Sequence, residues 1–144
     1  MVVNLLALFG LAVCTWTDLR EKRIYISVIV SCFIMLFAAQ VVSGVFSPYV
    51  AASGLCMGIV FFFLFFITRG QIGAGDALMF SMVAFAIQGM ELAYCILLTF
   101  IFLFGMAVLL IALKKADGRT QLPVAPFLLV SYLFIIFNPA GIIK

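Results

Sequence analysis

The stretch that decides the fold is Leu92–Leu113, "LAYCILLTFIFLFGMAVLLIAL", which contains no charged side chain. A transmembrane helix needs about 20 consecutive, mainly apolar residues to cross a hydrocarbon core about 30 Å thick. This run is long enough and apolar enough to predict a helix that spans a membrane.

The rest of the chain has the same character. Its residues are 68% hydrophobic and 9% charged, and its mean hydropathy is +1.42, whereas soluble domains are roughly half apolar and a quarter charged. We therefore predict an all-α, polytopic membrane protein with about six spanning helices in a single domain, residues 1–144. The predicted spans are Val2–Trp16, Ile24–Val42, Tyr49–Thr68, Asp76–Gln88, Leu92–Leu113 and Pro123–Phe137.

The ends of these runs predict the topology. The first run resembles an export signal but lacks its basic n-region, so we expect it to be retained as a span. Lys and Arg concentrate in cytoplasmic loops, and here they follow the first, third and fifth spans, with only Lys144 on the other side. Both termini are therefore predicted to lie outside the cytoplasm. The basic loops favour contact with anionic lipid headgroups over nucleic acid.

Missing residue types narrow the chemistry. The chain has no His, which excludes Ser-His and Cys-His nucleophile pairs and most zinc sites. Its four cysteines form no C-x-x-C pair and lie within apolar runs, as small hydrophobic residues do. No nucleotide-binding glycine pattern is present. We expect neither a metal ion nor a cofactor.

Two carboxylates stand apart from the other acids. Asp18 follows the first predicted span in "CTWTDLREKR", and Asp76 opens the fourth in "GAGDALMF". Glu21 and Asp117 lie in cytoplasmic loops, and Glu91 lies in an outer turn. The topology places Asp18 and Asp76 at the cytoplasmic ends of their helices. A partly buried carboxylate in a membrane is costly and indicates a functional site.

Each Asp also has a structural interpretation. Asp76 is a favoured residue at a helix start, where it complements the helix dipole, and Asp18 suits an interfacial pair with Arg20 or Arg23. As a close pair, however, the two carboxylates would share one proton. The ionised member could then take a proton from water while the protonated member donates to a peptide carbonyl, as in aspartyl proteolysis.

The glycines before Asp76 fit the same chemistry. Gly73 and Gly75 have no side chains, so an extended substrate backbone could approach the carboxylate at this point. We therefore take Gly73 and Gly75 as candidate substrate-binding positions, and Asp18 and Asp76 as the candidate catalytic pair.

These segments resemble a known family. "GAGD", Gly73–Asp76, resembles the G-x-G-D signature of intramembrane aspartyl proteases, which include presenilin-like enzymes and type IV prepilin peptidases. "TDLREKRI", Thr17–Ile24, resembles the first motif of the prepilin peptidases, and "LPVAPFLLVSYLF", Leu122–Phe134, resembles their C-terminal segment. The resemblance implies that Asp18 and Asp76 are catalytic, that the protein lies in a bacterial inner membrane, and that its partners are prepilins or pseudopilins.

The chain is most similar in size to the short peptidases of tight-adherence (Flp-type) pilus systems. It has no room for the cysteine-bearing insert of the longer enzymes, which implies that it lacks N-methyltransferase activity. It departs from the family at Leu78, where many members have Lys, and at Tyr25 and Ile26, where they have Pro-Asn. The first departure predicts a change in how the Asp76 charge is tuned, and the second a change in the loop that enters the second span. Together they leave open a divergent specificity or a degenerate enzyme.

Two other functions fit parts of the pattern. A small proton-coupled transporter could use Asp18 or Asp76 as its protonation site, although such a protein usually has an acid near mid-membrane and an inverted repeat, and we detect no repeat. A noncatalytic scaffold could pack through Gly54 and Gly58, a G-x-x-x-G pair that suits contact with another helix of this chain or of a second copy.

Overall fold

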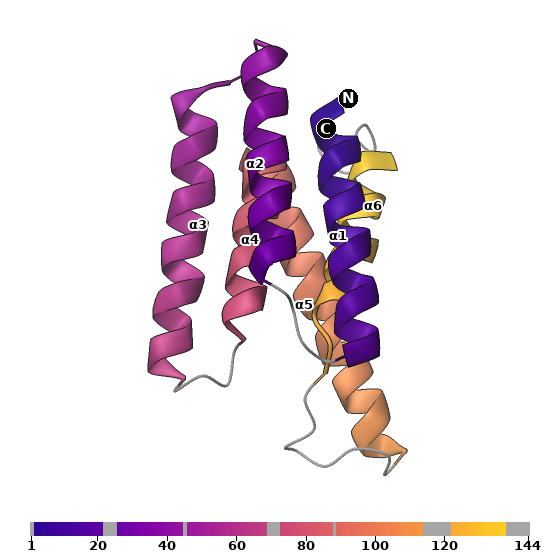
Figure 1. Cartoon of the computed structure of the whole chain (residues 1–144). Coiled ribbons are helices and arrows are strands. Elements are labelled where there is room, and N and C mark those ends of the chain that lie inside the picture. Colours follow the sequence, from indigo (N-terminus) through magenta and orange to yellow (C-terminus); the bar gives the residue numbers. More distant parts are fainter. Residues whose placement is uncertain are drawn as a thin grey trace.

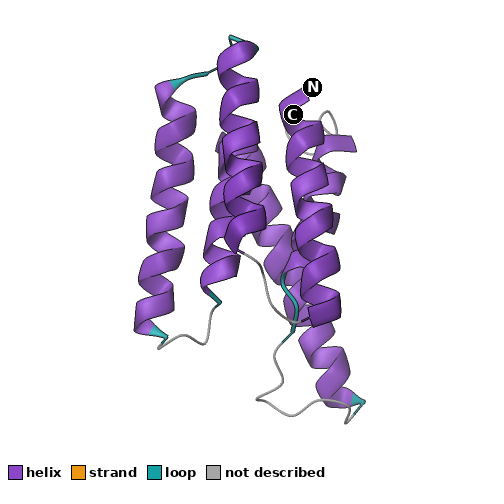
Figure 2. Ribbon diagram, in the orientation of Figure 1, coloured by secondary structure: helices purple, strands orange, loops and turns teal. Residues whose placement is uncertain are grey.

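The computed structural model describes residues 2–21, 26–44, 46–68, 73–87, 89–113 and 122–137. These ranges contain six α-helices and no strand, so the prediction of an all-α protein is confirmed (Figures 1 and 2). The helices are α1 (Val2–Glu21), α2 (Ile26–Val42), α3 (Pro48–Ile67), α4 (Ala74–Ala86), α5 (Gly89–Ala112) and α6 (Ala125–Phe137).

Three helices are long and apolar enough to cross a membrane. These are the segments Val2–Arg20, Pro48–Ile67 and Gly89–Ala112, while the other three helices are shorter apolar helices. Large apolar side chains cover the outside of the bundle, and Phe63 and Phe104 are 65% and 72% exposed. Such a surface suits lipid rather than water, which agrees with a membrane protein.

The helix boundaries follow the predicted spans closely, with one informative difference. The first predicted span ends at Trp16, but α1 continues to Glu21, so Asp18 lies inside the last turns of a helix and not after it. The Thr17 hydroxyl donates within the helix, at 2.9 Å from the carbonyl oxygen of Cys14. The residues that follow, Leu19, Arg20 and Glu21, are good helix formers.

The short helix α4 lies at the centre of the bundle. It packs against α1, α2, α3 and α6, while α1 also packs against α2 and α6, and α5 packs against α6 (Figure 1). Most of its side chains from Ala77 to Ile87 are buried, and several are completely inaccessible to solvent, including Met79, Met82 and Val83. The packing that holds α4 in place therefore also sets the position of Asp76, which lies in its first turn.

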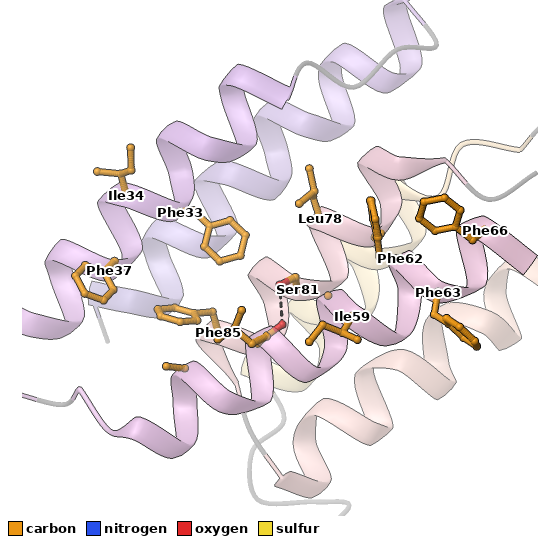
Figure 3. A pocket seen from close by; sticks show the side chains of 15 residues that line it. Phe33, Ile34, Phe37, Ile59, Phe62, Phe63, Phe66, Leu78, Ser81 and Phe85 are labelled. Carbon is orange, nitrogen blue, oxygen red and sulfur yellow. Dashed lines mark hydrogen bonds between the residues drawn. The ribbon is translucent and has the colours of Figure 1, made fainter. Parts of the chain in front are cut away.

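The contact between α3 and α4 is the closest helix packing described. A Cβ added at Gly54 would lie 2.8 Å from Phe85 Cδ2, and one at Gly58 would lie 3.1 Å from Ser81 Oγ. The Ser81 hydroxyl donates to the carbonyl oxygen of Gly54 at 2.7 Å, the dashed line in Figure 3. The G-x-x-x-G pair therefore packs against a helix of its own chain.

Candidate active site

Asp18 lies near the end of α1 and is only 9% exposed. Its carboxylate interacts with the backbone N–H of Ala125, the first residue of α6. A helix N-terminus carries unpaired N–H groups and a partial positive charge, so this contact stabilises the charged carboxylate. The other carboxylate oxygen, Oδ2, is buried and has no hydrogen-bond partner among the described residues. It is therefore an atom of Asp18 that can hold a proton.

Asp76 lies in the first turn of α4, whose N-cap is Gly73. Its carboxylate interacts with the backbone N–H of Gly73, and its own N–H donates to the Gly73 carbonyl oxygen at 3.0 Å. An acid three residues after the N-cap that reaches back to the N-cap N–H forms half of a capping box. The structural role expected of Asp76 is therefore present in the fold.

The glycines of "GAGD" lie beside this carboxylate. A Cβ at Gly73 would lie 3.3 Å from Asp76 Oδ2, so a side chain there would crowd the acid. Gly73 is exposed and Gly75 is half-buried. Another molecule can therefore reach the backbone next to Asp76 from the end of α4.

The fold brings Asp18 and Asp76 together. The Asp18 charge acts on the Asp76 carboxylate, although the two residues lie on different helices and far apart in the sequence. Helices α1 and α4 pack against each other, and both pack against α6. The interactions of Asp18 with Ala125 and with Asp76 place the last turns of α1 beside the N-terminus of α6 and the first turn of α4. Two interacting carboxylates in a low-dielectric environment can hold one shared proton.

Of the two basic partners proposed for Asp18, only Arg20 lies among the described residues. Arg20 is exposed, and Arg23 lies outside the described residues. The contact that the structure does show, with the N–H of Ala125, was not predicted. No sequence signal identifies it, because a backbone N–H is present at almost every residue and only the helix packing selects this one.

A large apolar groove lies on another face of α4. It has a volume of about 900 Å³ and is lined by residues of α2, α3 and α4, including Leu78, Ser81 and Phe85 (Figure 3). Successive helix residues turn by about 100°, so Asp76 lies on roughly the opposite side of α4 from Leu78 and Phe85. The groove is therefore not an extension of the carboxylate site.

The departures from the family pattern fall in different places. Leu78 lines the groove and lies away from the Asp76 carboxylate. Tyr25 lies outside the described residues, and Ile26 is the first residue of α2. The prediction that Leu78 tunes the charge of the Asp76 carboxylate is therefore supported by no direct contact between the two side chains.

The cysteines are free thiols, and two of them, Cys14 and Cys95, are buried in the apolar core. Cys14 lies one turn before Asp18 on α1, which packs against α2. No group of three or more His, Cys, Asp or Glu residues that could hold a metal ion occurs within the described part of the chain.

Comparison with protein families identifies the chain. Residues 5–113 match the type IV leader peptidase family, so the chain belongs to this family. It is therefore a peptidase, and its family implies a prepilin-type substrate. The matched region contains Asp18, Gly73, Gly75 and Asp76. Comparison with curated proteins and with solved structures gives no significant match.

Proposed function

We propose that the protein is an intramembrane aspartyl endopeptidase that removes the short basic leader from prepilins or pseudopilins. Asp18 and Asp76 are its catalytic pair, and the cut is made at the cytoplasmic face of the inner membrane. The observation that carries the proposal is the proximity of Asp18 and Asp76, whose helices α1 and α4 pack against each other and whose charges interact, in a chain that belongs to the type IV leader peptidase family.

The pair performs the hydrolysis by moving protons. The ionised carboxylate takes a proton from a water molecule, whose oxygen attacks the carbonyl carbon of the scissile peptide bond, while the protonated carboxyl donates to the carbonyl oxygen. The C–N bond of the tetrahedral intermediate then breaks, and the leaving nitrogen takes up a proton. The buried, unpartnered Oδ2 of Asp18 provides a place for the shared proton.

The backbone around Asp76 admits the substrate. Gly73 is exposed and Gly75 half-buried, and neither has a side chain to block an extended peptide that approaches the carboxylate. A prepilin presents its leader on the cytoplasmic side of the membrane, where the positive-inside rule puts both aspartates. With six spans, the same rule places both termini outside the cytoplasm. The short connection between α1 and α2 leaves no room there for the insert of the longer enzymes, which favours a peptidase of the Flp type without methyltransferase activity.

The family assignment favours this function over the proton-coupled transporter. The scaffold alternative is weakened as well, because Gly54 and Gly58 are already covered by Phe85 and Ser81 of the same chain. A homo-oligomer would need a different contact surface.

A gel mobility assay tests the proposal. A Flp-type prepilin is co-expressed with the wild type, with Asp18→Asn, with Asp76→Asn or with Glu91→Gln, and the membrane level of each variant is measured. Glu91 is a half-buried acid at the other end of the bundle, so Glu91→Gln is a matched control for loss of a carboxylate. Wild type and Glu91→Gln should shorten the prepilin, and the two Asp variants should not. Normal processing by either Asp variant would overturn the mechanism.

A further inference from the structure

The outer end of α4 poses a problem for a helix in lipid. The helix has 13 residues, which at 1.5 Å per residue makes it about 20 Å long, against a hydrocarbon core of about 30 Å. If its first turn faces the cytoplasm, its last turn ends inside the hydrocarbon. The last four carbonyl groups of any helix lack helical partners, and an unpaired carbonyl in lipid costs several kcal/mol.

Side chains from two neighbouring helices bond to two of these carbonyls. Gln40 of α2 donates from Nε2 to the carbonyl oxygen of Phe85 at 2.6 Å. The Ser53 hydroxyl of α3 lies 3.1 Å from the carbonyl oxygen of Ala84, and 2.9 Å from that of Val50 in its own helix. The N–H of Ile87 donates to Val83 at 2.9 Å. Two of these contacts tie α4 to other helices.

Gln40 is not explained by packing. Its side chain is 3% exposed, and its Oε1 is buried with no partner among the described residues. A buried amide with an unpaired oxygen costs free energy that an apolar side chain of similar size would avoid. We therefore take the hydrogen bond to the Phe85 carbonyl oxygen as the reason for an amide at position 40.

This bond acts on the other end of the same helix. Phe85 and Asp76 are nine residues apart, or about 14 Å along one rigid helix, so a shift at Phe85 along the axis moves Asp76 by the same amount. A misplacement of about 1 Å can reduce catalysis by about 10²-fold. The steric contact between Gly54 and Phe85 guides the same turn of α4. The Ser81 hydroxyl also joins α4 to the Gly54 carbonyl oxygen at 2.7 Å, but this bond leaves the last carbonyls of α4 unpaired.

We propose that Gln40 is a positioning residue, which with Ser53 clamps the outer end of α4 and thereby sets the depth of Asp76 relative to Asp18. The inference rests on the proposed function, in which Asp76 is catalytic. Without the clamp, the outer end of α4 loses the side-chain bonds that hold it against α2 and α3, and the polar start of the helix then favours a slide toward cytoplasmic water.

The depth of position 76 can be measured without enzyme activity. In a chain whose four native cysteines are replaced by alanine, Asp76→Cys is labelled from the cytoplasmic side with a membrane-impermeant maleimide. The rate is compared with and without Gln40→Leu. Ser31→Ala is the matched control, because the Ser31 hydroxyl is exposed and bonds only within α2, to Ser27 at 2.8 Å.

The clamp predicts that Gln40→Leu raises the labelling rate several-fold and that Ser31→Ala leaves it unchanged. Ser53→Ala, a milder change, should raise it less. In the chain with Asp76 intact, Gln40→Leu should lower kcat for prepilin cleavage about tenfold or more, with KM unchanged. A purely structural role would instead reduce the amount of folded protein and leave kcat per folded molecule the same.

The possible results separate the two proposals. An unchanged or lower labelling rate in Gln40→Leu, or an equal rise in Ser31→Ala, would overturn the clamp whatever the activity shows. If the wild type cuts no prepilin, the proposed function fails, while the labelling rates still decide whether Gln40 holds α4 in place.

Discussion

Gly54 on α3 faces Phe85 on α4 so closely that a Cβ on the glycine would lie 2.8 Å from the Phe85 ring. Gly54→Ala should therefore force the two helices apart and destabilise the protein by about 1–3 kcal/mol, the usual cost of an overpacked core. Gly58→Ala meets Ser81 Oγ at 3.1 Å and should have a smaller effect. The midpoint of thermal unfolding in detergent measures both.

The matched control is Gly105→Ala on α5, where nothing lies within 4 Å of the added Cβ. Because Ala favours a helix by about 1 kcal/mol over Gly, this variant should be as stable as the wild type or slightly more stable. An equal loss of stability at Gly105 and Gly54 would show that the α3–α4 contact is not the cause.

Tyr132 tests the cost of an unpaired buried group. Its side chain is fully buried, and its hydroxyl has no hydrogen-bond partner among the described residues. Tyr132→Phe removes only that hydroxyl, so the variant should unfold at the same temperature as the wild type or higher.

Ser81→Ala provides the comparison, because the Ser81 hydroxyl joins α4 to the Gly54 carbonyl oxygen. Its loss should destabilise the protein by about 1 kcal/mol. If Tyr132→Phe is destabilised as much as Ser81→Ala, the Tyr132 hydroxyl has a partner and the interpretation is wrong.

The family pattern and the structure give different predictions for the role of Leu78. The sequence suggests that a residue two positions after Asp76 tunes its charge, but Leu78 lines the apolar groove, on roughly the opposite side of α4. Leu78→Ala should therefore keep kcat for prepilin cleavage within a few-fold of the wild type. A loss as complete as that of Asp76→Asn would place Leu78 in the catalytic site.

The sequence predicts the helices well because a membrane makes hydropathy decisive. Each of the six apolar runs corresponds to one helix, and the predicted span Ile24–Val42 differs from α2 by two residues at its start. The error at the end of α1 has a clear reason: Thr17 to Glu21 are polar enough to end an apolar run, yet their backbone continues the helix.

The site is only partly predictable. Asp18 and Asp76 stand out because few acids occur in so apolar a chain, and the predicted topology places them on one side. The N–H of Ala125 beside Asp18 depends on how α6 packs against α1, which no local pattern encodes. Gln40 did leave a signal, since a polar amide near the end of an apolar span is uncommon, but only the structure shows that it bonds to Phe85.

The most direct test of the account is cleavage of a purified Flp-type prepilin by the purified protein in liposomes, with the product mass determined. The wild type and Glu91→Gln should remove the leader at similar rates. Asp18→Asn and Asp76→Asn should each be slower by about 10²–10⁴-fold, because an amide cannot act as the acid or the base. Cleavage by either Asp variant at the wild-type rate would contradict the paired-carboxylate mechanism.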